Sequence, residues 1–129
     1  MSNKYEDAGD LTTNSKDKEF IEKLLKYVND NIENDNLNII NIADEFSMSS
    51  STFFRKVKII TGTTGKEFID SVRLKRATKL LLESDLNISE IAYAIGHSNP
   101  QYFSKWFKSH YKMSPSEYIL KNKIKDNNS

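Results

Sequence analysis

Residues 38–46, NIINIADEF, recur in altered form as residues 87–95, NISEIAYAI. One Asn, two Ile and one Ala coincide at an offset of 49, and after the following turn the match continues at an offset of 50. Two copies are too few for a solenoid, so the repeat indicates a small unit that has been duplicated. The later matches pair Phe53 with Phe103, Arg55 with Lys105, Lys58 with Lys108 and Phe68 with Tyr118.

Each copy has the layout of a helix-turn-helix, in which a short apolar helix, a turn and a second helix follow one another. Ala43 and Ala92 are small, so we expect them to lie where the two helices of each copy approach closely. The second helices mix polar residues with large apolar ones. The small core of each copy is expected to include Phe53, Val57, Phe103 and Phe107.

Apolar side chains recur with the helical period of about 3.6 residues along most of the chain, and no stretch predicts a strand. The stripe of the first helix runs from Phe20 to Ile32. Asn99 and Ser114 precede prolines as helix caps, and Gly62 is a natural helix stop. The sequence predicts seven helices, at about 17–32, 39–46, 50–61, 64–83, 88–95, 100–111 and 115–123.

The predicted fold class is all-α, with two homeodomain-like helix-turn-helix subdomains joined by a long central helix. That helix, of about twenty residues, should be roughly 30 Å long. Neighbouring major grooves on one side of a duplex lie about 34 Å apart, so such a helix can place two recognition helices in successive grooves. We expect a disordered lead-in or linker at 1–15, units at 16–62 and 85–123, a connecting helix at 63–84 and a tail at 124–129.

Composition narrows the function. The chain has no cysteine, which excludes disulfides and zinc ribbons and favours the cytoplasm. No apolar run approaches the roughly eighteen residues of a membrane span, so we expect no membrane contact and no secretion signal. Five Lys against eleven acidic residues give residues 1–52 a charge of −6, whereas thirteen basic against six acidic residues give 53–123 a charge of +7. A basic half is typical of nucleic-acid surfaces.

The second helix of each copy leaves a polar and basic outer face. Arg and Gln side chains can make paired hydrogen bonds to base edges, while Lys and Ser suit phosphates and single contacts. The sequence therefore predicts binding of double-stranded DNA. The candidate DNA-binding residues are Ser50, Ser51, Phe54, Arg55, Lys58, Asn99, Gln101, Tyr102, Lys105 and Lys108.

Other chemistry has little support. His97 and His110 are the only histidines and lack a nearby carboxylate pair, so no metal site is expected. The serines at 47–51 have no His–acid partner, and no Gly-rich phosphate loop occurs, so we expect no catalytic residue and no cofactor. Aromatic residues such as Phe103 have core spacing, which disfavours a platform for single strands. The alternative that stays open is a protein–protein interaction module of a regulatory complex, without base readout.

These residues resemble the DNA-binding domain of the AraC/XylS family of bacterial regulators. The matching pieces are IADEFSMSSSTFFRKVKIITG (42–62), RLKRATKLL (73–81), ISEIAYAIGHSNPQYFSKWFK (88–108) and SPSEY (114–118). The resemblance implies two units in successive major grooves, with half-sites about one helical turn apart. It implies base reading by Ser51, Phe54, Arg55, Gln101, Tyr102 and Lys105, backbone contacts by Lys58 and Lys108, and a structural ion pair for Arg73.

The sequence departs from the family pattern at three places. His97 stands where Phe is usual, Gly65 where Pro is usual, and Lys112 where a cap Gly is usual. The segment FIEKLLKYVNDNIENDNLN (20–38) resembles the one preceding output domains of two-component-type regulators, including hybrid sensor proteins that respond to polysaccharide breakdown products. The resemblance thus implies an activator that works with RNA polymerase, and an upstream sensor or receiver domain absent from this chain.

Overall fold

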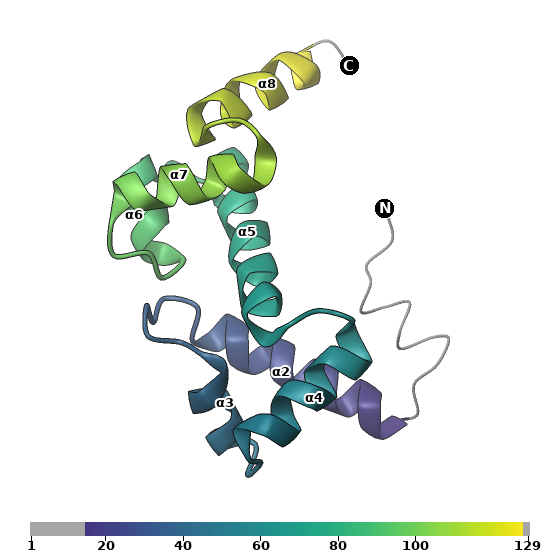
Figure 1. Cartoon of the computed structure of the whole chain (residues 1–129). Coiled ribbons are helices and arrows are strands. Elements are labelled where there is room, and N and C mark those ends of the chain that lie inside the picture. The colour runs from purple at the N-terminus through teal and green to yellow at the C-terminus, as the bar shows by residue number, and fades with distance from the viewer. Residues whose placement is uncertain (1–14, 128–129) are drawn as a thin grey trace. The chain divides into compact units, whose positions relative to one another are not determined.

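The computed structural model describes the backbone of residues 15–127 and the side chains of residues 15–123. This part of the chain forms seven α-helices and no strand, which confirms the predicted all-α fold (Figure 1). The expected lead-in at 1–15 lies outside the described residues, except for Ser15. The helices are α2 Ser15–Asp30, α3 Ile39–Glu45, α4 Ser50–Thr61, α5 Gly65–Glu83, α6 Ile88–Ala94, α7 Pro100–Tyr111 and α8 Pro115–Asn127.

The described residues divide into two compact units. Unit 1 comprises residues 15–31 and 36–72, and unit 2 comprises residues 32–35 and 73–127. The division falls within α5, so this helix contributes its first part to unit 1 and its second part to unit 2. No helix within residues 15–127 is both long enough and apolar enough to cross a membrane.

The core of unit 1 is built from one face of each of its helices. Leu24 and Val28 of α2 are fully buried, as are Phe53 of α4 and Phe68 of α5. The ring of Phe53 lies 5.3 Å from that of Phe46, which follows α3, and 5.6 Å from that of Phe20. Burial of a side chain of this size contributes about 1.5–3 kcal/mol, so this aromatic cluster is a main source of stability in unit 1.

The core of unit 2 repeats this plan with different side chains. Ala92 is fully buried, and its equivalent in unit 1, Ala43, is only 1% exposed. The Phe107 ring stands edge-on to Tyr118 of α8 at 5.5 Å, and this contact ties α7 to α8. The buried cluster consists of Ala77, Leu81, Ile91, Ala92, Ile95, Phe103 and Phe107.

The backbone of the turns shows the same duplication as the sequence. In unit 1 the N–H of Met48 donates to the carbonyl of Ala43 at 3.0 Å. In unit 2 the N–H of His97 donates to the carbonyl of Ala92 at 2.8 Å. Ser47 and Gly96, the residues before these donors, have left-handed φ angles of 55° and 89°. The two helix-turn-helix turns therefore close with equivalent hydrogen bonds and the same left-handed residue.

The helix that follows each helix-turn-helix also begins in the same way. Thr64 and Glu67 form a reciprocal capping box at the start of α5, with hydrogen bonds of 2.9 and 3.1 Å. Ser114 and Glu117 form the same box at the start of α8, with hydrogen bonds of 3.0 and 3.1 Å. Each box satisfies backbone N–H groups that a helix start leaves without partners.

Candidate nucleic-acid interface

The outer face of α4 carries the first group of predicted DNA-binding residues. Ser49 caps the helix, because its hydroxyl oxygen accepts from the N–H of Thr52. Positions three and four apart on a helix share a face. Ser51, Arg55 and Lys58 follow this spacing and are exposed, and Phe54 beside them is 44% exposed. Ser50 is half-buried at the start of the helix.

The outer face of α7 carries the second group. Gln101, Lys105 and Lys108 follow the same helical spacing and are exposed, and Tyr102 next to them is 60% exposed. Asn99 is exposed but acts as the helix cap. Its side-chain oxygen accepts from the N–H groups of Gln101 at 2.9 Å and Tyr102 at 3.2 Å. Its side-chain amide nitrogen is thus the group suited to a phosphate.

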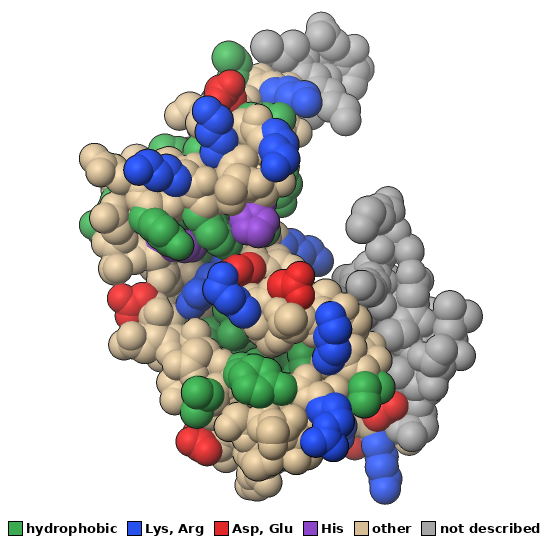
Figure 2. Space-filling model, viewed as in Figure 1, with side chains coloured by type: hydrophobic (Ala, Val, Ile, Leu, Met, Phe, Trp, Pro, Cys, Tyr) green, Lys and Arg blue, Asp and Glu red, His purple; other side chains and the backbone are tan. Residues whose placement is uncertain are grey.

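The two outer faces mix cations with exposed apolar surface. Figure 2 shows Lys and Arg side chains interspersed with hydrophobic ones on the visible face of the molecule. Lys56, which was not among the predicted residues, turns away from the outer face of α4, since its Nζ lies over the ring of Phe20 at 4.6 Å from the centroid. Thr52 is also exposed at the start of α4 and was not among the predicted residues.

Lys108 has an acidic neighbour in unit 2. Hydrogen bonds from the backbone and side chain of Ser114 lower the pKa of Glu117, and the positive charge of Lys108 lowers it further. Glu117 therefore stays ionised and its negative charge partly balances that of Lys108. Lys58, at the equivalent position of unit 1, instead reaches the carbonyl of Gly62 at 3.5 Å.

His97 packs against the recognition helix of unit 2. Its ring centroid lies 4.4 Å from that of Trp106 and 5.7 Å from that of Tyr102. The ring centroids of Trp106 and His110 lie 5.3 Å apart in a T-shaped arrangement. The residue that replaces the usual Phe therefore holds Tyr102, a candidate base reader, by ring contact. Sequence spacing gave no signal for this contact, because His97 lies in the turn.

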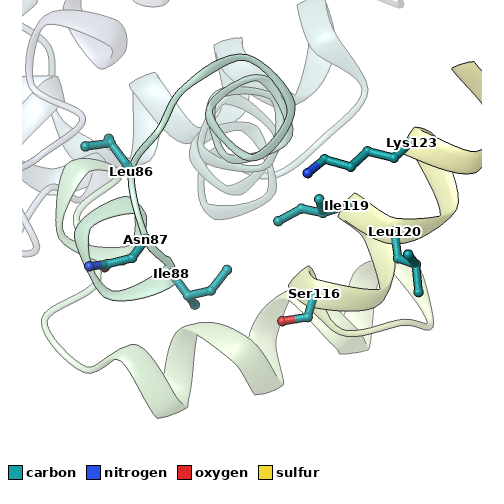
Figure 3. A pocket seen from close by; sticks show the side chains of 7 residues that line it. All are labelled: Leu86, Asn87, Ile88, Ser116, Ile119, Leu120 and Lys123. Carbon is teal, nitrogen blue, oxygen red and sulfur yellow. The ribbon is translucent and has the colours of Figure 1, made fainter.

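A groove in unit 2 lies apart from the outer face of α7. It runs between α8 and the segment before α6 and has a volume of about 420 Å³ (Figure 3). Lys123 is the ionisable side chain that lines it, so the groove lacks an acid–base pair. Among the described residues, no group of three His, Asp or Glu side chains is placed to hold a metal ion. Its remaining lining residues are Leu86, Asn87, Ile88, Ser116, Ile119 and Leu120.

Known proteins are similar to this chain in sequence. Histidine kinase P4 of Formosa agariphila is 38% identical over 109 residues, which are 84% of this chain and 8% of that protein. The transcriptional activator RhaS of Escherichia coli is 34% identical over 94 residues, 73% of this chain and 34% of RhaS. The chain thus spans a small part of both proteins.

A solved structure and a family model agree with these relatives. The C-terminal domain of AraT, a response regulator from Geobacillus stearothermophilus, superposes with a TM-score of 0.74 at 26% identity, covering 78% of this chain and 84% of that domain. The family model described as a helix-turn-helix domain matches residues 42–121, which include both turns and both outer faces. This chain belongs to the AraC-type helix-turn-helix family of DNA-binding transcription regulators.

Proposed function

We propose that this chain reads double-stranded DNA sequence-specifically, with α4 in one major groove and α7 in the next. The observation that carries the proposal is the equivalence of the two outer faces. Arg55 and Lys58 on α4 correspond to Lys105 and Lys108 on α7, and all four are exposed. An exposed basic helix face suits the major groove, where phosphates flank the base edges.

The side chains suggest a division of roles. Arg55 suits the paired acceptors of guanine, and Gln101 suits the donor and acceptor of adenine. Phe54 is apolar and exposed, and it suits the methyl group of thymine. Tyr102 and Lys105 complete the reading face of α7. Ser51 suits a single contact to a base edge, and the phosphate contacts are assigned to Ser50, Lys58, Asn99 and Lys108.

The length of α5 supports reading of successive grooves by one chain. Its 19 residues correspond to about 28 Å at the helical rise. This is close to the roughly 34 Å between neighbouring major grooves on one side of a duplex. A single chain would then occupy two half-sites about one turn apart, which most helix-turn-helix proteins achieve as dimers.

We infer that the parent protein is a hybrid two-component regulator and that this chain is its output domain. The likeness to Histidine kinase P4 and to the response regulator AraT supports this inference. The signal would come from a sensor or receiver domain upstream. The DNA-bound domain would act in the bacterial cytoplasm with RNA polymerase, as an activator by analogy with RhaS. The proposal assigns no reaction to this chain.

Salt dependence of binding to pooled random duplexes tests the proposal. A protein that neutralises phosphates loses affinity steeply between about 50 mM and about 200 mM salt, because bound counterions are released. The variant Lys58→Ala/Lys108→Ala should lower the salt slope by about two, one for each lysine. Lys26→Ala is the control, since Lys26 on α2 pairs with Asp30 at 2.8 Å.

The opposite results are equally informative. A wild-type protein without salt-dependent retention on duplex DNA would overturn the proposal and favour the protein–protein interaction module. An unchanged slope in the double variant would remove Lys58 and Lys108 from the phosphate contacts.

A further inference from the structure

Arg73 makes a contact that the proposed function leaves unused. It lies on α5 within unit 2, and it is 9% exposed. Its Nη2 donates to the carbonyl oxygen of Asn34 at 2.8 Å. Asn34 belongs to residues 32–35, which follow α2 in the chain and yet pack in unit 2. A buried guanidinium bonded to a backbone carbonyl fixes that segment in place, because an unpartnered buried charge is costly.

Gly96 lies directly against this pair. It is the turn residue between α6 and α7, with a left-handed φ of 89°. A Cβ added to Gly96 would collide with the carbonyl oxygen of Ile32 and would lie 2.9 Å from Nη2 of Arg73. Ile32 itself is 2% exposed. Residues 32–35, the Arg73 guanidinium and the second turn therefore form one close-packed contact, here called the turn clamp.

The first turn differs from the second at the positions equivalent to Gly96 and Arg73. Ser47 occupies the position equivalent to Gly96, with a left-handed φ of 55°, and it is exposed. A residue with a Cβ therefore fits the equivalent turn where that position is exposed. The residue equivalent to Arg73 at the offset of 49 is Leu24, an apolar core residue that cannot donate a hydrogen bond. Gly96 therefore serves two purposes. It adopts the left-handed φ of the turn, and it leaves room for the Ile32 carbonyl and the Arg73 guanidinium.

The clamp lies next to the start of the second recognition helix. His97 directly follows Gly96, and its ring packs on Trp106 of α7. Asn99, the cap of α7, is two residues further along. A shift of Gly96 is therefore transmitted to the first turn of α7, where Gln101 and Tyr102 lie.

We propose that Arg73 is a positioning residue for base reading by α7, and that residues 32–35 help to hold α7 in its reading position. This inference rests on the proposed function, since it concerns how well α7 is held for its half-site. Arg suits the role better than Lys, because its planar fork can donate to the Asn34 carbonyl while its Cζ and Nη2 lie against Gly96.

The test combines two measurements on the full chain with the variants Arg73→Ala and Arg73→Lys. The first is amide hydrogen exchange of residues 32–35 and 95–98 without DNA. The second uses a DNA site obtained by selection, with one short block of base pairs for α4 and one for α7. It measures the loss of affinity when the sequence of either block is scrambled. Lys75→Ala is the matched control, because Lys75 is an exposed cation two residues along the same helix.

The clamp predicts a selective effect of Arg73→Ala. Amide exchange at residues 32–35 should accelerate. The loss of affinity on scrambling the α7 block should become about tenfold smaller, which corresponds to the loss of one charge-assisted hydrogen bond. The penalty for the α4 block should stay unchanged. Arg73→Lys should give the same pattern at smaller size, and Lys75→Ala should change neither measurement.

A second variant keeps the test decisive if Arg73→Ala does not fold. Gly96→Ala retains the guanidinium but drives a Cβ into the Ile32 carbonyl, so besides the selective loss it should accelerate exchange at 32–35, which strain of the left-handed φ of Gly96 alone would not do. Ser47→Ala, at the equivalent turn position, should do neither. Unchanged exchange in the variants, or equal loss on both blocks, would overturn the inference. A wild-type protein that ignores both scrambled blocks would instead overturn the proposed function, while the exchange data would still decide whether the clamp exists.

Discussion

Gly62 and Lys112 occupy equivalent positions at the ends of α4 and α7, and both have left-handed φ angles, of 76° and 62°. Each donates its backbone N–H to the carbonyl of the lysine four residues earlier, Lys58 or Lys108. The left-handed region costs a residue with a Cβ roughly 1–2 kcal/mol and costs glycine little. The second recognition helix therefore ends in a strained cap.

Relieving this strain should stabilise unit 2. We expect Lys112→Gly to raise the free energy of unfolding by up to about 1 kcal/mol, after the entropy of glycine in the unfolded chain is subtracted. Thermal unfolding followed by circular dichroism measures the change, and Gly62→Lys should show the reverse. A lower melting temperature for Lys112→Gly would mean that the contact of Lys112 Nζ with the Ser109 carbonyl, at 3.3 Å, outweighs the backbone strain.

Gly65 should tolerate no side chain. It is the buried first residue of α5, and an added Cβ would lie 3.2 Å from Cβ of Ile39 and collide with the outer carbons of that side chain. Gly65→Ala should cost roughly 1–3 kcal/mol by overpacking. Lys66→Ala, at the exposed neighbouring position, should stay within about 0.5 kcal/mol. If Gly65→Ala melted no lower than the wild type, Ile39 would have to rotate aside freely.

The alanines at the two helix crossings should behave alike. Ala43→Leu or Ala92→Leu adds three carbon atoms at a fully packed site and should cost roughly 1–3 kcal/mol in unfolding free energy. Ala94→Leu is the control, because Ala94 is half-buried on the same helix as Ala92. Equal melting temperatures for Ala92→Leu and Ala94→Leu would refute a close crossing at Ala92.

Arg55 should determine sequence preference at one or two base pairs. Arg55→Ala should weaken binding to the preferred operator by roughly 1–3 kcal/mol and relax the choice of base there. Arg55→Lys keeps the charge but loses the paired hydrogen bonds, so it should relax the choice similarly. Lys56→Ala is the control on the neighbouring residue. Uniform weakening of Arg55→Ala on all sequences would make Arg55 a phosphate contact.

The capping box of α8 should make stability depend on acid pH. Hydrogen bonds from Ser114 hold the pKa of Glu117 below its ordinary value of 4.5. Because the folded pKa is the lower one, the carboxylate stabilises the fold above pH 4.5 and loses this effect as the pH falls through the folded pKa. The difference in melting temperature between wild type and Glu117→Gln should therefore shrink in acid. A difference that stayed constant down to about pH 3 would contradict this reading.

The recognition helices could be predicted closely because their ends carry local signals. The predicted ranges of α4 and α7 agree with the observed Ser50–Thr61 and Pro100–Tyr111. Ser49 and Asn99 cap the starts, and Gly62 stops α4. The predicted end of α8 at 123 was four residues short, because residues 124–127 contain no glycine or proline and the helix continues to Asn127.

The first helix shows where periodicity misleads. Ile32 continues the apolar stripe of α2, and it is indeed buried, but α2 ends at Asp30. Ile32 belongs to unit 2, and a pattern of apolar spacing cannot tell to which unit a buried residue belongs. The same limit hid the hydrogen bond between Arg73 and Asn34, which lie 39 residues apart in the chain.

The exposed faces of α4 and α7 could be predicted, but the contacts that hold them could not. Helical spacing assigns Arg55 and Lys105 to the outside once Phe53 and Phe103 are assigned to the core. The packing of His97 on Trp106 depends on how the turn folds back on α7, which no local pattern specifies. Base roles follow from side-chain chemistry and stay predictions.

Selection of bound duplexes from a random library, at two salt concentrations, tests the central claim most directly. Two reading units in successive grooves predict an enriched site with two short blocks about one helical turn apart, with the same blocks at both salts. Enrichment of a single block, or of none, would contradict the claim that α4 and α7 read DNA together.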